Sequence, residues 1–555
     1  MKKKVLITAA LPYINNVPHM GHIVGSHLPA DIFYRYCIQK GLDATFIGGS
    51  DEHGTPSVIA AMKAKKGTKE FVDSLHAIHE KIYKKLNISY SNYSRTTNES
   101  HHMEVKEFFN KAYENGYITS SKSEMYYSEK DKMFLPDRFI TGTCPRCKNE
   151  GANGDQCEKC SYIFKGVTEL LNPKSTLSNA TPVLRESTHL YINLESLSEA
   201  LEEWIDGKKD VWKNHVYSEA KKWLREGLKS RSITRDMDWG IGVPLEEFEN
   251  KVFYVWFDAP IGYITFAKEI DKGEWWKDGE VYHFLGKDNI PFHTIFWPSM
   301  LIANETYKLP HEVVGYNYLN FEGQKFSKSK GVGVFCYHLL SSDLDIDSLR
   351  FYLTSVLPEN KDSDFKWEDF RNLVNGELIG NFSNFCNRTL NMVWKNLDGS
   401  FTFDGVYKEK EKGFMAKIEE HINHIKGYYD SVEIRAARRT ILELSSLGNK
   451  YFDEMEPWKL AKEGKVEELK GVLNISLNII RSLAILMAPI LPDKMEKLWK
   501  EQLDLEGSPL EEEAYMSLGT VFNSHKINKP SPLFKRIEKE DLDSLRDYFA
   551  QPYNL

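Results

Sequence analysis

The beginning of the chain alternates between short apolar runs and longer polar or helical segments, and this order limits the fold more than any other feature. Residues 4–8 form a β-branched, apolar run, residues 21–40 carry a helical pattern that ends at Gly41, and residues 45–47 form a second apolar run. Strand, helix and strand in this order make a parallel βαβ unit. Ligands bind such sheets where the strands end. The sequence therefore predicts an α/β fold with a Rossmann-like parallel sheet and a ligand site near its strand ends.

One residue does not fit the helix expected at 21–40, and later segments extend the predicted fold. Pro29 lies inside the expected helix and lacks a backbone N–H, so we expect it to kink or delay that helix. Strand-like runs at 252–257 and 281–285 predict that the sheet resumes there. Residues 472–486 belong to a long region with apolar periods near 3.6 residues, which predicts packed helices.

A chain of 555 residues exceeds what one hydrophobic core usually supports, so we expect several domains. The broken periodicity after about residue 115 indicates an insertion into the sheet domain. The predicted division is a catalytic domain in two halves (1–115 and 231–323), a connective insertion (116–230), a region of a phosphate-binding loop (324–370) and an α-helical domain (371–555).

Composition and charge narrow the class of protein. Acidic side chains outnumber basic ones by 80 to 72, so the chain lacks the basic excess of a non-specific nucleic-acid coat. Residues 1–14 superficially resemble a secretory signal, but Pro12 and the following asparagines contradict that interpretation. No run of 18 apolar residues occurs, and the cysteines outside one cluster are scattered, as in reduced thiols. We expect a cytoplasmic protein without a membrane segment.

A histidine pair follows the first predicted strand, in the sequence Pro18-His19-Met20-Gly21-His22. A helix that begins here would offer free backbone N–H groups to a phosphate, and Gly21 would allow close approach. The two imidazoles could donate hydrogen bonds to phosphate oxygens. Taken alone, the pair is equally compatible with surface or core histidines.

A basic string occurs about three hundred residues later, as Gln324-Lys325-Phe326-Ser327-Lys328-Ser329-Lys330-Gly331. Lysines on long stems beside serines and glycines are typical of a mobile phosphate clamp. A solvated basic loop is the alternative for this string alone.

Together these two strings resemble the HIGH-like and KMSKS-like signatures of class I aminoacyl-tRNA synthetases. Further strings are similar to those of the methionine-tRNA ligases, over nearly the whole chain to about residue 537: 10–13, 51–56, 256–263, 286–288 and 292–293. Met20 and Phe326 depart from the usual signatures, but both positions are apolar spacers. The resemblance implies ATP-dependent activation of L-methionine to methionyl-adenylate, with Mg²⁺, and transfer of the methionyl group to tRNA(Met), initiator tRNA included.

The resemblance also implies roles for individual residues. Catalysis falls to His19, His22, Lys325 and Lys328, and binding of the nucleotide to these four with Gly21, Ser327 and Asp288. Asp51 would hold the substrate ammonium. The walls of the methionine pocket would be Leu11, Tyr13, Trp256, Ala259, Pro260, Ile261, Tyr263 and His293. A methionine thioether packs well on aromatic rings, although each of these aromatics taken singly is as well explained by core packing.

Four cysteines predict a metal site from their spacing alone. Cys144 and Cys147 form one CxxC pair, and Cys157 and Cys160 form a second after nine residues. Two such knuckles suit one tetrahedral Zn²⁺, and four thiolates leave no open position, so the ion would be structural. Two disulfides are the alternative. The spacing also matches the zinc knuckle of the methionine-tRNA ligases.

In the helical region, Asn384, Arg388 and Trp458 resemble the residues with which this family reads the CAU anticodon. Asn384 and Arg388 are four positions apart and would share one helical face. The alternative is a set of helix-capping polar residues beside a half-buried tryptophan.

Three other functions remain compatible with parts of the sequence. A ligase for leucine, isoleucine or valine shares both signatures, but the roughly 140 residues between Glu114 and Phe253 leave little room for its editing insertion. A small nucleotidyltransferase would not need residues 371–555, and a zinc-bearing scaffold would not need the two phosphate signatures. Because the chain ends soon after the helical region, we expect a monomer.

Overall fold

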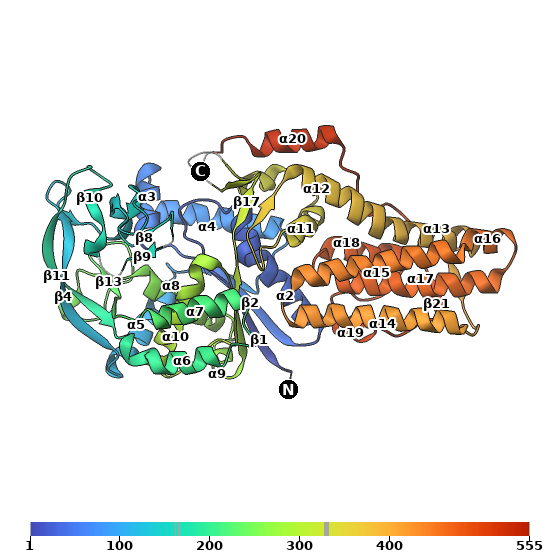
Figure 1. Ribbon diagram of the computed structural model, residues 1–555, viewed down its shortest axis with the longest axis horizontal. Coiled ribbons are helices and arrows are strands. Elements are labelled where there is room, and N and C mark those ends of the chain that lie inside the picture. The colour runs from blue at the N-terminus through green and yellow to red at the C-terminus, as the bar shows by residue number, and fades with distance from the viewer. Residues whose placement is uncertain (1, 161, 165–166, 327–331, 554–555) are drawn as a thin grey trace.

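Five parallel strands form the central sheet of the computed structural model, in the order β16-β15-β1-β2-β3 (Figure 1). The structure describes residues 2–160, 162–164, 167–326 and 332–553. Leu6 in the middle strand lies opposite Thr45 and Val281. The strands are β1 (Lys4–Ala9), β2 (Asp43–Ser50), β3 (Asn92–Arg95), β15 (Glu280–Gly286) and β16 (Glu312–Tyr316). The predicted parallel α/β fold is confirmed.

Both faces of this sheet are covered, which explains why its strands are apolar throughout. Val5 and Ile7 of β1 join the core on one face, together with α2 (Leu28–Gln39) and α4 (Thr68–Lys85). Leu6 and Ile47 join the core on the other face, under α5 (Glu99–Glu114), α8 (Val255–Lys268) and α10 (Trp297–Asn304). Two shorter helices complete these layers, α3 (Thr55–Lys63) and α9 (Trp275–Asp278).

The order of the strands places a ligand crevice at one edge of this sheet. From β1 the chain runs outward to β2 and β3 on one side and later to β15 and β16 on the other. The crossover after β1 therefore runs toward β2 and the crossover after β15 runs toward β16, in opposite directions. A crevice forms between them at the carboxyl ends of these strands.

The helix after β1 shows how the chain accommodates Pro29. It begins as α1 (Met20–His22), widens to a π-helical turn over Ile23–His27, and continues as α2. Pro29 is the second residue of α2, directly after the wide turn. The expected disturbance at Pro29 is thus a π-turn within one continuous helical segment.

The prediction of a strand at 252–257 is wrong. Only β14 (Val252–Phe253) is extended there, and it pairs with β13 (Thr234–Arg235) outside the central sheet. The apolar run continues as the buried helix α8, because a short run of bulky residues fits a buried helix as well as a strand. The other predicted strand, at 281–285, lies in β15 and is confirmed.

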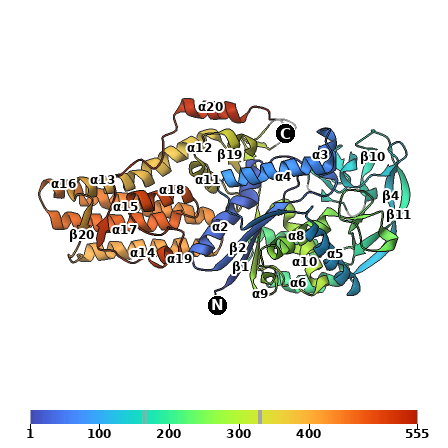
Figure 2. The same ribbon diagram turned by 180° about the vertical axis from the view of Figure 1, so that it is seen from behind.

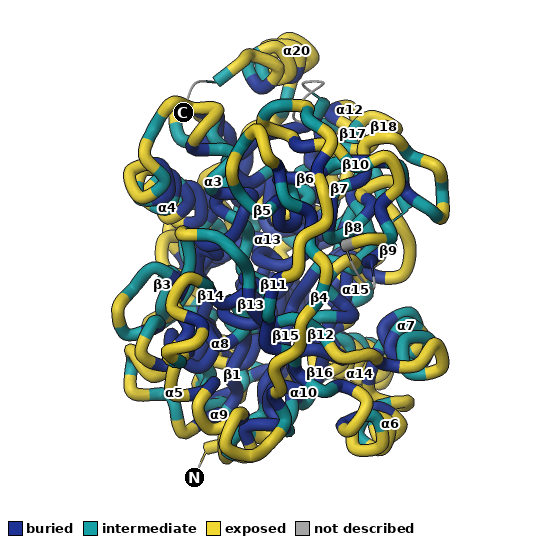
Figure 3. The backbone as a smooth tube through the Cα atoms, turned by 90° about the vertical axis from the view of Figure 1, so that its left-hand side faces the viewer, coloured by how far each residue is buried: buried dark blue, intermediate teal, exposed yellow. Residues whose placement is uncertain are grey.

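Residues between β4 and β13 form an insertion at one end of the molecule (Figure 3). Its largest element is an antiparallel ladder in which Ser123 of β4 lies opposite Ser187 of β11. Figure 3 shows exposed residues along β4 and α6 and mostly intermediate ones along α7, while β1 and β15 of the central sheet are buried. The elements are β4 (Ile118–Ser128), β5 (Met133–Phe134), β6 (Ile140–Thr143), β7 (Ala152–Asn153), β8 (Gln156–Cys157), β9 (Tyr162–Ile163), β10 (Leu171–Ser175), β11 (Val183–Ile192), α6 (Ser198–Asp206), α7 (Asn214–Arg225) and β12 (Arg231–Ser232).

After β16 the chain leads through a small sheet into the long helices at the other end of the molecule (Figure 1). The small sheet contains β17 (Leu319–Phe321), β18 (Gln324–Lys325) and β19 (Ser363–Phe365), and a short pair joins β20 (Ser400–Thr402) to β21 (Ser524–Lys526). The helices are α11 (Ile346–Ser355), α12 (Trp367–Leu373), α13 (Asn384–Asn396), α14 (Glu409–Asp430), α15 (Ile434–Met455), α16 (Pro457–Lys462), α17 (Val466–Met487), α18 (Pro492–Lys497), α19 (Glu512–Met516) and α20 (Lys539–Phe549).

Helix α17 is the core of these helices and contains the predicted segment 472–486. Among the described helices it is the one that is long and apolar enough to cross a bilayer, but 89% of its apolar window is buried inside the protein. Its apolar character is therefore explained by packing against its neighbours.

A buried ion pair joins the sheet domain to the helices. The Arg350 guanidinium is fully buried and donates to the Asp31 carboxylate of α2 at 2.7 Å. It also donates to the backbone carbonyls of Pro489 and Ile490, beyond the end of α17. Figure 2 shows α2 at the junction between the two halves. Removing one partner would leave a buried charge, so this joint fixes the two halves against each other.

Candidate active site and metal centre

A cavity of about 1310 Å³ opens at the carboxyl ends of β1 and β2. Residues 10–13 after β1 and Asp51 after β2 form its floor, and residues of α8 and the segment 289–293 form one wall. His19 and His22 also line the cavity. The cavity thus occupies the place at which the strand order predicts a ligand.

The two histidines of the first signature present matching hydrogen-bond donors. The backbone N–H of His19 donates to Nδ1 of His22 at 3.1 Å, and the N–H of Gly21 donates to Nδ1 of His19 at 3.1 Å. Each Nδ1 is therefore an acceptor, which places the ring proton of each neutral imidazole on Nε2. Both rings can then donate Nε2–H to an anion. A Cβ on Gly21 would lie 2.8 Å from Cε1 of His19, so a side chain there would displace that ring.

Both imidazoles are neutral at physiological pH. Loss of hydration lowers the pKa of His19 well below its usual value, and the neighbouring His22 lowers it further. Loss of hydration also lowers the pKa of His22. The histidines therefore supply hydrogen bonds rather than charge, and cations for a polyphosphate must come from elsewhere.

The second signature meets the first at this side of the cavity. The Phe326 ring stacks on His19 at 4.5 Å between centroids and 16° between planes. The described residues that follow 327–331 contact the histidine signature as well. The Met20 N–H donates to the Val334 carbonyl at 3.1 Å, and His19 forms a β-bridge with Phe335. Ser327 and Lys328 lie outside the described residues. The described flanks of the lysine string thus converge on the histidines.

Lys325 is the described lysine of this string and lies exposed in β18. Its Nζ lies 5.3 Å from the centre of the Tyr318 ring, while Nζ of Lys287 lies 3.8 Å from the same ring. The Tyr318 hydroxyl donates to Asp288. Asp288 lines a neighbouring cavity of about 890 Å³ that shares Tyr13, His22 and Asn289 with the first. The structure thus places Asp288 beside the main cavity.

The aromatic residues expected around methionine gather on one wall. Nε1 of Trp256 donates to the Tyr13 hydroxyl at 2.6 Å, and the Trp256 ring meets Phe292 at 3.9 Å between centroids. The Tyr263 hydroxyl and Nε2 of His293 are 2.9 Å apart. Leu11, Ala259 and Pro260 also line the cavity, whereas Ile261 is fully buried in the core behind it.

Asp51 brings a carboxylate without a counter-ion into this wall. Its side chain is buried, and Oδ1 has no hydrogen-bond partner among the residues that the structure describes. Burial raises the pKa of Asp51 well above its usual value, and the carboxyls of Asp258 and Glu52 raise it further. A buried carboxylate with one unpartnered oxygen is stabilised by a cation that enters the cavity. This geometry suits a ligand ammonium.

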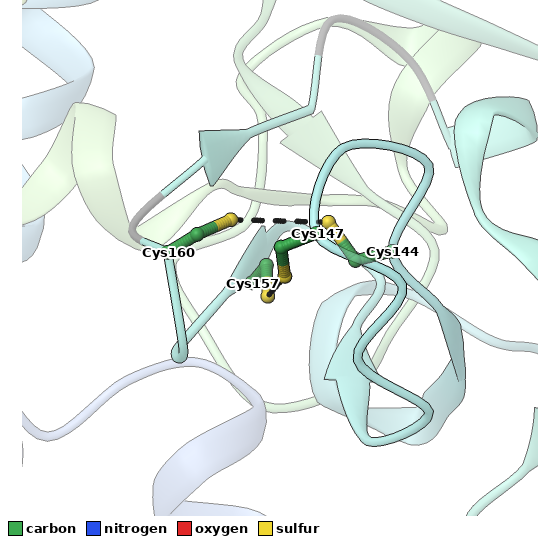
Figure 4. A group of neighbouring side chains, drawn as sticks. All are labelled: Cys144, Cys147, Cys157 and Cys160. Atoms are coloured by element: carbon green, nitrogen blue, oxygen red, sulfur yellow. Dashed lines mark hydrogen bonds between the residues drawn. The ribbon is translucent and has the colours of Figure 1, made fainter.

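The four cysteines form a compact cluster in the insertion (Figure 4). Their sulfur atoms all lie within 4.8 Å of one another, with 3.9 Å between Cys144 and Cys160 and 3.6 Å between Cys147 and Cys157. A tetrahedron with Zn–S bonds of about 2.3 Å has edges of about 3.8 Å, whereas sulfurs in a disulfide are about 2.05 Å apart. The cluster therefore fits one closed Zn²⁺ site and not two disulfides.

The metal cluster is connected to the cavity through Arg138. The Arg138 guanidinium pairs with Glu158 between the last two cysteines at 3.2 Å, and its backbone N–H donates to Thr55 at the start of α3. Arg138 and Glu158 both line the cavity. Ordering the cysteine knuckles therefore also orders part of the cavity wall.

We expect the chain to bind about one zinc ion and Cys157→Ser to lose it, since a serine hydroxyl is a poor substitute for a thiolate. Metal analysis by atomic emission spectroscopy checks this expectation. Cys386→Ser, a cysteine outside the cluster, is the matched control and should retain zinc. A zinc-free wild-type chain whose four cysteines resist alkylation until reduced would support disulfides instead.

Asn384, Arg388 and Trp458 lie far from the cavity, on α13 and α16 at the other end of the molecule (Figure 1). Asn384 is exposed at the start of α13. The Arg388 guanidinium pairs with Asp453 and lies 5.9 Å from the centre of the Trp458 ring. The Trp458 side chain is 42% exposed, so its ring remains accessible for stacking.

Several cavity residues escaped the sequence-based prediction. Phe292 lies next to His293 in a string that carried the resemblance, so position gave a signal for it. Arg138 and Tyr553 gave none, because an isolated arginine or tyrosine far from either signature has no distinguishing pattern. Both are brought to the cavity by chain segments whose path only the fold reveals.

Comparison with known proteins assigns the chain to a family. The model of class I tRNA synthetases (M) matches residues 5–390, and the model of the anticodon binding domain of methionyl tRNA ligase matches residues 403–553. Methionine–tRNA ligase of Bacteroides fragilis is 41% identical over 548 residues, covering 98% of this chain and 80% of that protein. The enzyme of Pyrococcus abyssi is 40% identical over 562 residues, covering 97% and 76%.

A solved structure shows the same fold. The Mycobacterium tuberculosis methionyl-tRNA synthetase in complex with methionyl-adenylate superposes with a TM-score of 0.81 at 24% identity, covering 96% of this chain and all of that one. Both family models, the relatives and the fold agree. The chain belongs to the methionine–tRNA ligases, a family of class I aminoacyl-tRNA synthetases.

Proposed function

We propose that this chain activates L-methionine with MgATP and transfers the methionyl group to tRNA(Met), including the initiator tRNA. A methionine carboxylate oxygen bonds to the α-phosphorus of ATP, the bond to the bridging oxygen breaks, and methionyl-adenylate and pyrophosphate result. The terminal ribose hydroxyl of the tRNA then attacks the methionyl carbonyl and AMP leaves. The observation that carries the proposal is that His19 of the first signature stacks on Phe326 of the second beside a cavity also lined by Asp51, a buried carboxylate whose Oδ1 has no described partner.

Catalysis of the first step depends on positioning and charge, because a carboxylate needs no general base. His19 and His22 donate Nε2–H to phosphate oxygens, and Gly21 allows the phosphates to approach the helix start. Lys325, Ser327 and Lys328 close on the triphosphate, and Mg²⁺ enters with ATP as part of the substrate. Asp288 binds the nucleotide ribose from the adjoining cavity.

Methionine binds against the aromatic wall. Its ammonium pairs with Asp51, and its thioether lies among Trp256, Tyr263 and His293. Tyr13, Leu11, Ala259 and Pro260 complete the pocket, and Ile261 supports it from behind. The hydrogen bond between Tyr263 and His293 is fixed by a second one, from Nδ1 of His293 to the Asn289 carbonyl at 3.0 Å. The neutral ring of His293 therefore faces an uncharged side chain.

The remaining assignments concern the rest of the molecule. Cys144, Cys147, Cys157 and Cys160 hold a structural zinc ion, and Asn384, Arg388 and Trp458 contact the anticodon. We also propose that the chain acts as a monomer in the cytoplasm. The division into domains at residues 115, 230, 323 and 370 is part of the same proposal.

The test is methionine-dependent exchange of pyrophosphate into ATP, measured separately with each amino acid. Methionine alone should support rapid exchange, and charging should then require a tRNA transcript with a CAU anticodon. A transcript that differs only in those three bases is the matched control and should be charged far more slowly. Exchange with leucine, isoleucine or valine at a comparable rate would contradict the proposed substrate.

A further inference from the structure

The C-terminal segment, defined here as α20 and residues 550–553, returns from the long helices to the catalytic cavity. Figure 1 shows α20 lying above α12. The Phe549 ring packs against Trp367 of α12 at 5.3 Å between centroids. From this anchor the last described residue, Tyr553, reaches the cavity and forms part of its wall. No part of the mechanism above uses it.

Tyr553 contacts the loop that leads into the histidine signature. Its hydroxyl donates to Oδ1 of Asn16 at 3.0 Å. The backbone carbonyl of Asn16 is fixed in turn by Nε2 of His79 at 2.8 Å, and Asn16 itself lines the cavity. Three residues after Asn16 comes His19. The tyrosine hydroxyl is thus one of the described hydrogen bonds that set the position of this loop, together with those of the Asn16 and Pro18 carbonyls.

Tyr553 also contacts the segment that follows the lysine string. Its ring lies 5.4 Å from Phe335 and stacks on Tyr337 at 5.5 Å and 26°. Phe335 forms the β-bridge with His19, and the rings of these two residues are 6.2 Å apart. The rings of Tyr553, Phe335 and His19 therefore form a continuous packed row that ends at the phosphate side of the cavity.

The rest of the C-terminal segment holds the same part of the chain. Nε2 of His338 donates to the Gln551 carbonyl at 2.9 Å, and the Tyr548 hydroxyl donates to the His338 carbonyl at 3.2 Å. The segment itself is unsuited to contacts with an RNA backbone, because α20 carries four acidic and two basic side chains. Its contacts favour a role in shaping the cavity.

We propose that Tyr553 is a positioning residue for ATP, which holds the Asn16 loop and Phe335 so that His19 meets the phosphates. This inference rests on the proposed function and adds a residue to it. Because Tyr553 touches the two segments that flank the phosphate side, it acts on nucleotide binding. The methionine wall, built from α8 and the segment 289–293, has no described contact with it.

The test is Tyr553→Phe, which keeps the ring and removes the hydroxyl. Loss of one buried hydrogen bond should raise KM for ATP in pyrophosphate exchange by about fivefold to tenfold, with KM for methionine changed less than about twofold. Ser544→Ala also removes one hydroxyl of this segment, but that hydroxyl donates to the Glu540 carbonyl within α20, so the change should leave both values unchanged. Asn16→Ala should raise KM for ATP similarly, and the double variant should show little further effect because both changes break one contact.

The possible outcomes distinguish a failure of the role proposed for Tyr553 from a failure of the proposed function. An active wild-type chain with an unchanged KM for ATP in Tyr553→Phe would overturn the role of Tyr553 alone. An equal rise in KM for methionine, or an effect confined to KM for tRNA, would also overturn it. A wild-type chain without methionine-dependent exchange would overturn the proposed function instead. Thermal denaturation of each variant shows whether the fold is retained.

Discussion

His22→Ala is expected to lower kcat for methionine-dependent pyrophosphate exchange by about 100-fold to 1,000-fold, the usual cost of losing one donor to a developing charge. KM for methionine should change little, because His22 lies on the phosphate side of the cavity. The expected loss of kcat follows from the hydrogen bond that the His19 N–H donates to Nδ1 of His22. This bond leaves Nε2–H of His22 as the donor toward the ligand. Steady-state exchange at varied methionine and ATP measures both values.

Two controls sharpen this result. His22→Gln retains an N–H donor on a side chain of similar length and should recover part of the rate. His27 on the same helix is buried and bonded to Tyr90, away from the cavity wall, so His27→Gln should keep the rate if the variant folds. Because loss of hydration at the cavity wall lowers the pKa of His22 to about 4, activity should show no loss from imidazole titration as pH rises above about 6. A loss of activity there, absent from His22→Gln, would mean that the charged ring is required.

Asp51→Asn is expected to raise KM for methionine by about 100-fold or more, since removing one partner of a buried ion pair costs about 3–5 kcal/mol. The amide keeps the size of the carboxyl and loses its charge. KM for ATP should change far less. Exchange kinetics with methionine, and with a methionine analogue that lacks the ammonium, measure the effect: the analogue should bind wild type and variant almost equally.

The pH dependence of the same residue gives an independent check. The folded chain raises the pKa of Asp51 above its unfolded value of 3.8, so the protonated form persists to higher pH and cannot pair with the ammonium. The value of kcat/KM for methionine should therefore rise with pH through that raised pKa in the wild-type chain, and this rise should be absent from Asp51→Asn.

Stability should move in the opposite direction to binding. A carboxyl whose pKa is raised by folding destabilises the fold progressively between its unfolded pKa and its higher folded pKa, because the unfolded chain loses the proton in this range while the buried group keeps it. Above the folded pKa the loss of stability is constant. Asparagine cannot ionise, so Asp51→Asn should melt at a higher temperature than wild type at neutral pH. A variant that both binds methionine poorly and melts earlier would indicate a structural role for Asp51.

The sheet could be predicted from sequence because its central strands are short apolar runs with clear boundaries. Residues 4–8, 45–47 and 281–285 are short apolar runs that end in polar or small residues, and all three lie in central strands. Residues 252–257 show the limit of this reasoning. An apolar run has no periodicity when every face is buried, so α8 could not be distinguished from a strand. The π-turn before Pro29 depends on packing that no local pattern expresses.

The parts of the candidate site differed in how far they could be predicted from sequence. The spacing of the four cysteines is local, so it predicted a metal site without knowledge of the fold, and the structure brings the four sulfurs together. Trp256, Tyr263 and His293 came together only through resemblance to a family, because residues from separate segments share no sequence pattern. The charge environment of Asp51 depends on Asp258 from α8, and the contact of Phe326 with His19 depends on a path of about three hundred residues between them. Such relations arise from tertiary structure alone.

The buried pair of Arg350 and Asp31 has a consequence for how an RNA would be chosen. This joint anchors the sheet domain to the long helices by a buried contact, and the catalytic cavity and the exposed Trp458 lie on its two sides. A nucleic acid that engages both must span the distance between them by its own shape. The protein would therefore select an RNA by shape as well as by sequence. An RNA with the right three anticodon bases would still be rejected if the distance from its anticodon to its acceptor end did not match.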